Sequence, residues 1–204
     1  LMEKLEGRAP TEIGGSSTLQ KNPPANNRLQ RRINHESFLR FLAQKGIVDD
    51  DINTETLAAA TTDLVLRLTW RLIQAYDLNM TVEDVAAGVD GTEPLLSWVR
   101  GQCAAADGMV HAGLQSPDTA WTAGFSDGRV FSRLIAATRP SALDLAASER
   151  LASASERLTL VFDTAQALGV PRLLDEADMA EGEADSRSVV TYVLELKARI
   201  GKPL

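Results

Sequence analysis

One short stretch constrains the fold of this chain more than any other: DGRVFSRLIAATRP, from Asp127 to Pro140. Asp-Gly is a turn sequence, and the run behind it is one helix long before an Arg-Pro pair stops it. Its apolar residues recur at helical spacing, at Val130, Phe131, Leu134 and Ile135. The pattern predicts a turn that directs an amphipathic helix into a core. It contains no catalytic, metal-binding or phosphate-binding motif, so its role is structural.

The composition predicts an all-α chain. Of its 204 residues, 44% are hydrophobic and 5% aromatic, with abundant Ala and Leu and few segments rich in β-branched residues. No window has the roughly 18 consecutive apolar residues that a membrane span needs. The chain starts at Leu1 without a signal peptide, so we expect a part of a longer protein. A single cysteine, Cys103, favours a reducing compartment.

The charge distribution excludes two classes of partner. The net charge is −7; residues 1–78 contain ten Lys/Arg and ten Asp/Glu, and the remainder contains eleven against eighteen. An acidic second half argues against broad nucleic-acid binding, which needs a basic face. It also argues against electrostatic docking on anionic lipid.

Periodicity and capping signals predict most of the helices. We expect long helices over residues 34–45, 61–76, 92–106, 129–138, 155–168 and 185–200, a short helix after residue 52, and one helical turn within 77–91. Asn34 and Thr92 are the predicted N-caps of two of them. Residues 8–27, 107–125 and 170–179 are predicted to be mostly loop or turn, and Leu1–Gly7 the end of a helix. In the 61–76 helix, Leu64, Leu68, Leu72 and Ala75 form an apolar stripe that Val65, Trp70 and Ile73 widen.

Candidates for chemistry are few, and each favours a structural interpretation. His35 and His111 belong to no spaced ligand motif. Cys103 is interpreted as a packed small residue. DDDINTET has oxygen ligands at alternate positions like a calcium loop, but Thr56 and Thr62 stand where Gly and Glu are needed. We therefore predict no enzyme activity, no metal and no cofactor.

The second half resembles the calponin-homology domain, in particular the second of the tandem pair in alpha-actinin, filamin and spectrin. The shared pattern begins with LLSW at residues 95–98, continues through W-x3-F-S-D-G-x2-F-x2-L-I-x4-P at 121–140, and closes with F-x-x-A…L-G-V-P-R-L-L-D at 162–175. The two aromatics are exchanged, with Trp121 at the family's Phe position and Phe125 at its Trp position. The resemblance covers about 110 residues in order.

The first half resembles the first domain of that pair, cut short at its N-terminus. LMEKLEG, the residues around Leu39–Ile47, and L-V-L…W…I at 64–73 match it. Two departures stand out: Ala59-Ala60-Thr61 replaces Asp-Gly-Asn, and Arg67 replaces a Gly. The resemblance implies an incomplete first domain at 1–78, a linker at 79–91 and a second domain at 92–202.

Tandem domains of this family bind the side of filamentous actin, so the resemblance implies an actin-binding domain of a crosslinking or anchoring cytoskeletal protein in the cytoplasm. The implied contacts are Arg28, Arg31 and Arg32 in a basic turn before the helix at Asn34, Thr62, Asp63, Leu66, Arg67 and Arg71 on the helix that follows, and Leu95, Leu96 and Val99 on the first helix of the second domain. Trp98 is predicted to pack between the domains. Because residues 103–121 contain no Lys or Arg, we expect no phosphoinositide site there.

Two alternatives remain open. A calponin-homology scaffold could bind a signalling or cytoskeletal protein without touching actin, and the departures at residues 59–61 and 67 favour it. Some single domains of the family bind microtubules through basic faces, which the acidic second half argues against.

Overall fold

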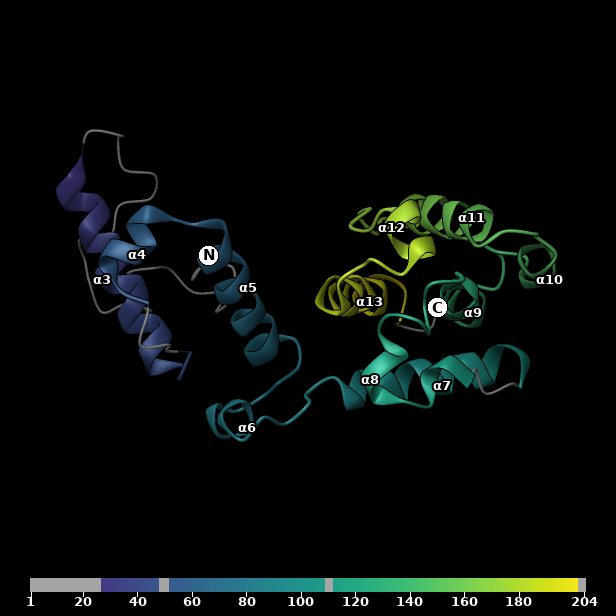
Figure 1. Ribbon diagram of the computed structural model, residues 1–204, viewed down its shortest axis with the longest axis horizontal. Coiled ribbons are helices and arrows are strands. Elements are labelled where there is room, and N and C mark those ends of the chain that lie inside the picture. The colour runs from purple at the N-terminus through teal and green to yellow at the C-terminus, as the bar shows by residue number, and fades with distance from the viewer. Residues whose placement is uncertain (1–26, 48–51, 109–111, 202–204) are drawn as a thin grey trace. The chain divides into compact units, whose positions relative to one another are not determined.

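The structure, a computed structural model, describes residues 27–47, 52–108 and 112–201 (Figure 1). The helix predicted at 1–7, most of the loop predicted at 8–27 and His111 lie outside these ranges. Within them every regular element is a helix and no strand occurs, which confirms the all-α prediction. None of these helices combines the length and the apolar character needed to cross a bilayer.

The chain forms two compact units, Leu1–Gly91 and Thr92–Leu204. The described helices of unit 1 are α3 (Arg28–Gln44), α4 (Thr54–Ala59), α5 (Thr62–Tyr76) and α6 (Val82–Ala86). Those of unit 2 are α7 (Glu93–Asp107), the 3₁₀ turn η1 (Ala112–Leu114), α8 (Pro117–Ala120), α9 (Arg129–Thr138), α10 (Leu145–Glu149), α11 (Ala154–Ala167), α12 (Glu176–Glu181) and α13 (Ser186–Ile200). The sequence did not predict η1, α8, α10 or α12, because elements of three to six residues are too short to show a period.

Helix α3 begins six residues earlier than predicted. Its N-cap is Asn27, whose side-chain oxygen accepts a hydrogen bond from the Gln30 amide at 2.9 Å. Asn34, the predicted cap, lies inside the helix and accepts instead from the Gln30 side chain at 3.1 Å. The predicted basic turn is therefore the first turn and a half of a helix, because Arg and Gln are good helix formers behind an Asn cap.

Unit 1 is held together by α3 packed against α5. Its buried cluster contains Phe41, Leu42, Ile47 and Leu72, with Phe38, Leu68, Ala75 and Tyr76 partly buried against it. This confirms the predicted inward stripe of α5. Val65 is the exception: the sequence assigned it to the buried side, but half of its surface (49%) is exposed.

Helix α4 ends in a strained conformation. Its C-cap, Ala60, has φ 47° and ψ 46°, the left-handed region that L-residues other than Gly and Asn rarely adopt. By the resemblance described above, Ala60 is one of the residues expected to stand where the family's first domain has Asp-Gly-Asn. Residue 60 keeps the left-handed backbone conformation without a glycine. This conformation costs an alanine about 1 kcal/mol.

We predict that Ala60→Gly stabilises the protein by up to about 0.5 kcal/mol, because the relief of left-handed strain exceeds the greater entropy of glycine in the unfolded chain. Chemical denaturation of the chain measures this. The matched control is Ala58→Gly, two residues earlier in the helix, which should destabilise by about 0.5–1 kcal/mol. Equal destabilisation by both variants would contradict the strain at Ala60.

Unit 2 is built around α9. Figure 1 shows α9 between α7 and α11, and it packs against both and against α10. All four apolar residues that the sequence assigned to its inner face are buried. A run of aromatic contacts, with ring centroids 4.8–5.7 Å apart, joins the loop before α9 to α11 and α13: Trp121, Phe125, Phe131, Phe162 and Tyr192. The exchanged aromatics thus fill the core of the domain.

Thr92 occupies the predicted N-cap position of α7, but its side chain caps nothing. The Thr92 hydroxyl accepts a hydrogen bond from the indole N–H of Trp121 at 2.9 Å, and both residues are buried. An indole N–H in a core needs such a partner. The exchange that puts Trp at residue 121 is therefore accommodated by a threonine 29 residues away.

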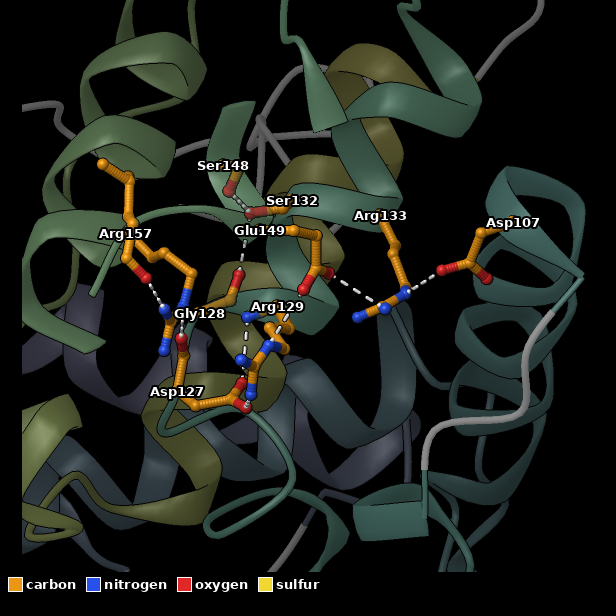
Figure 2. Close-up of polar contacts among 10 residues, drawn as sticks. Asp107, Asp127, Gly128, Arg129, Ser132, Arg133, Ser148, Glu149 and Arg157 are labelled. Carbon is orange, nitrogen blue, oxygen red and sulfur yellow. Dashed lines mark hydrogen bonds and ion pairs between the residues drawn. The ribbon is translucent and has the colours of Figure 1, made fainter. Parts of the chain in front are cut away.

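The Asp-Gly turn is fixed by a buried arginine (Figure 2). Arg157, on α11, donates from Nε to the Asp127 carbonyl at 2.7 Å and from Nη1 to the Leu151 carbonyl at 2.6 Å. Gly128 has φ 76°, and a Cβ there would lie 3.1 Å from the Arg157 Cβ. The turn therefore needs a glycine for its backbone angle and for the close approach of α11.

A line of alternating charges ties α9 to its neighbours (Figure 2). Arg133 is nearly buried, and its guanidinium lies 2.6 Å from Asp107 at the end of α7 and 2.9 Å from Glu149 at the end of α10. Arg129 joins Glu149 to Asp127, at 3.0 Å each. Three helices and the turn are thus held in register by paired charges.

We predict that Arg157→Met, which keeps the stem but removes the guanidinium, destabilises unit 2 by about 2–4 kcal/mol, because two partly buried carbonyls lose their partners. Thermal or denaturant unfolding measures it. Arg150→Met is the control, since that exposed arginine donates only to the Ala146 carbonyl in α10 among the hydrogen bonds of the described residues; it should change stability by less than about 0.5 kcal/mol. If Arg157→Met lowered the free energy of unfolding by no more than Arg150→Met does, the contacts of the Arg157 guanidinium would contribute little to stability.

Candidate functional site

The candidate site is the outward face of α5 in unit 1. The helix begins behind Thr61, whose hydroxyl accepts from the Leu64 amide, and its inner stripe is anchored in the core. A second stripe, at helical spacing on the other side, is exposed: Thr62, Val65, Leu66 and Thr69. Leu66 is 64% exposed, so two large apolar side chains stand together in solvent.

Charged side chains border this stripe. Asp63 is exposed, and its carboxylate lies 3.9 Å from the guanidinium of Arg67 one turn later. Arg67 and Arg71 are both half-buried, one turn apart. The structure therefore brings together the five α5 residues predicted as contacts, Thr62, Asp63, Leu66, Arg67 and Arg71. Val65 and Thr69 were not among the contacts predicted from the sequence. The helical period could have revealed them, because it places both on the same face as Thr62 and Leu66.

The three predicted arginines on α3 lie elsewhere in the unit. Arg28, Arg31 and Arg32 are exposed on the first turns of α3, where they line a groove shared with α4. His35, for which the sequence favours a structural interpretation, is half-buried in the same groove.

The predicted contacts on α7 do not form a surface. Leu95, Leu96 and Val99 are 3%, 1% and 0% exposed. The apolar face of α7 is turned toward α9, so these side chains are core residues and cannot meet a partner while unit 2 is folded. Their burial leaves them no exposed surface in this structure, and their assignment as contacts stays a prediction.

Trp98 lies on the same helix but is only half-buried. The ammonium of Lys197, on α13, lies 5.3 Å from the centre of its ring, a cation–π contact within unit 2. This contact does not test the predicted packing of Trp98 between the two domains, which stays a prediction.

Cys103 is buried on α7, as its interpretation as a packed residue requires. Burial raises the pKa of its thiol to about 11. The thiolate is therefore scarce in the folded protein at neutral pH, which makes the sulfur a poor nucleophile. In the described ranges, no three His, Cys, Asp or Glu side chains group closely enough to hold a metal ion.

We predict that iodoacetamide modifies native Cys103 much more slowly than unfolded Cys103, since both burial and the raised pKa withhold the thiolate. The raised pKa also predicts how stability depends on pH. The Cys103 thiol ionises at lower pH in the unfolded chain than in the folded one. Its contribution to the free energy of unfolding is therefore constant below about pH 9 and decreases as the pH rises toward 11. Alkylation followed by mass spectrometry, with and without denaturant, checks the first point. Cys103→Ser should flatten the alkaline loss in denaturation curves; an unchanged loss would assign it to other groups.

These features define a class of protein: an all-helical chain with a core-directed helix behind an Asp-Gly turn, and an exposed apolar helix face where it could bind a partner. The model of the Calponin homology (CH) domain matches residues 91–202. The chain belongs to this family, whose domain is a non-catalytic binding module.

Two curated relatives match beyond that domain. The chain is 29% identical over 167 residues to Microtubule-actin cross-linking factor 1 of Rattus norvegicus, covering 81% of this chain and 3% of that protein. It is 29% identical over 188 residues to Alpha-actinin-like protein 1 of Schizosaccharomyces pombe, covering 90% of this chain and 28% of that protein. The chain thus spans only a small part of the relatives' lengths.

A solved structure shares the fold. The crystal structure of the actin-crosslinking core of Schizosaccharomyces pombe fimbrin aligns with a TM-score of 0.66 at 19% identity, over 90% of this chain and 38% of that one. At this identity the likeness concerns the fold alone.

Proposed function

We propose that this chain is an actin-binding domain that binds the side of the filament through the outward face of α5. The observation that carries the proposal is the exposed stripe of α5, where Val65 and Leu66 stand in solvent beside Asp63, Arg67 and Arg71. A fully polar surface would leave no apolar area to bury, whereas an apolar centre with a charged border has the anatomy of a protein–protein interface.

We also propose that the two units are tandem calponin-homology domains, with 1–78 an N-terminally incomplete first domain, 79–91 a linker and 92–202 the second domain. The match of 188 residues to the alpha-actinin-like protein supports this, because it is longer than unit 2 and must extend into unit 1. The names of two similar proteins, Microtubule-actin cross-linking factor 1 and Alpha-actinin-like protein 1, support the filament as partner. A cytoskeletal location in the cytoplasm follows from that partner.

A second candidate is a scaffold module that binds another protein without touching actin. Arg67 favours it, since this residue replaces the family's Gly in the α5 face and pairs there with Asp63. A bulky charged side chain at that position changes the shape of the face that would meet a filament.

We predict that the chain, with any residues that precede Leu1 in its gene restored, pellets with actin filaments, and that Leu66→Ser weakens binding about tenfold, as loss of an apolar interface anchor does. Arg71→Glu should weaken it as well, and the effect of this charge change should shrink as salt rises. Cosedimentation over a range of salt concentrations measures both variants, with circular dichroism to confirm folding.

The matched control is Leu173→Ser, because Leu173 is an exposed leucine of unit 2 (48%). It should bind like the unmodified chain. If the folded, extended chain stays in the supernatant, the scaffold candidate replaces the filament proposal. If it pellets but Leu66→Ser and Arg71→Glu bind normally, the α5 face is not the contact surface.

A further inference from the structure

The groove between α3 and α4 is a hollow that the α5 face does not explain. Its volume is about 880 Å³. One wall is the first half of α3, with Arg28, Arg31, Arg32, Asn34 and His35, and the other is α4 and its end, with Thr54, Glu55, Leu57, Ala58 and Ala60. The two walls differ in chemistry, one basic and the other mostly small and apolar.

Two of the three guanidinium groups in the groove have no partner among the described residues. Arg32 is 2.8 Å from the Glu36 carboxylate one turn along α3. Within the described part of the chain, the exposed side chains of Arg28 and Arg31 have no hydrogen-bond or ion-pair partner. Three residues apart on a helix, they stand about 4.5 Å apart along its axis and point to the same side.

The basic wall is unusual for this chain. Helix α3 contains four arginines and one glutamate, whereas the whole chain has a net charge of −7. Unpaired arginines on a concave wall attract carboxylates or phosphates, and Arg binds both in a bidentate manner.

We propose that the α3–α4 groove binds an acidic peptide segment of a partner protein, with carboxylates on Arg28 and Arg31 and an apolar side chain against Leu57 and Ala58. The family resemblance implies these arginines as contacts on actin; the groove specifies the chemistry of the segment they take. This holds whether or not the partner is a filament.

The apolar wall favours a peptide over a phosphate or a lipid headgroup. A phosphate group would gain nothing from the apolar side chains of Leu57, Ala58 and Ala60. A peptide presents carboxylates and an apolar side chain on one strand. In an extended segment, alternate side chains point the same way and are about 7 Å apart, within reach of two flexible arginine stems.

The test uses the whole chain and a fluorescein-labelled peptide of repeating Glu-Leu-Glu-Ala units, followed by fluorescence anisotropy at physiological salt. We expect saturable binding that the double variant Arg28→Ser/Arg31→Ser weakens at least tenfold. The matched control is Arg40→Ser/Lys45→Ser, which removes the same charge from exposed residues at the other end of α3, outside the groove lining; it should bind the peptide nearly as well as the unmodified chain.

Two altered peptides distinguish the contribution of the arginine wall to binding from that of the apolar wall. Replacing Glu by Gln should abolish binding, and replacing Leu by Ser should weaken it several-fold. Equal losses in the two double variants would mean attraction to net charge alone and would overturn the proposal. Binding to vesicles containing phosphatidylinositol bisphosphate, with no binding of the peptide, would assign the groove to phosphate and overturn it too. Because no actin is present and Leu66→Ser should bind the peptide normally, this proposal and the filament proposal can fail separately.

Discussion

The arrangement of unit 2 depends on the buried guanidinium of Arg157. It satisfies the carbonyls of Asp127 and Leu151 on two different loops, and its Cβ lies where any side chain at residue 128 would have to go. A buried carbonyl without a donor costs more than a hydrogen bond contributes, so these two loops are stable only where α11 places the arginine. Once they are fixed, the direction in which α9 leaves the turn is fixed, and so is the surface that α7, α10 and α11 can cover.

Among its described residues, unit 1 has no comparable polar anchor and a smaller core. Helices α3 and α5 meet through a few aromatic and aliphatic side chains, and the α4–α5 turn keeps a left-handed backbone at an alanine. A unit that buries little of each helix leaves much of their surfaces uncovered. The exposed Leu66 on α5, and Arg28 and Arg31 on α3, which have no partner among the described residues, follow from this limited packing and are the features a partner can use.

Periodicity and the Asp-Gly turn predicted the long helices and the inner face of α9, because burial of one face imposes a repeat that a sequence displays. The same reasoning failed for Arg157 and Arg133, which look like surface residues. Their burial depends on carbonyls and carboxylates that are distant in sequence. It also did not reveal the burial of Leu95, Leu96 and Val99, since a helical stripe marks an apolar face but not whether core or partner covers it. For the α5 face, the family resemblance supplied the position and only the structure supplied the exposure of Val65.

The two surfaces of unit 1 suit different parts of one recognition event. Charged groups attract a partner over about a Debye length and so influence its approach and its register. Apolar groups interact only in direct contact, where they lower the dissociation rate. In a chain with a net charge of −7, a general attraction to acidic partners is excluded, so such attraction has to be local. Helix α3 provides a local source, four arginines against one glutamate on a helix that shares its core with α5. Because both helices are fixed to that one core, a partner that engages the arginines also meets unit 1 in a restricted set of orientations.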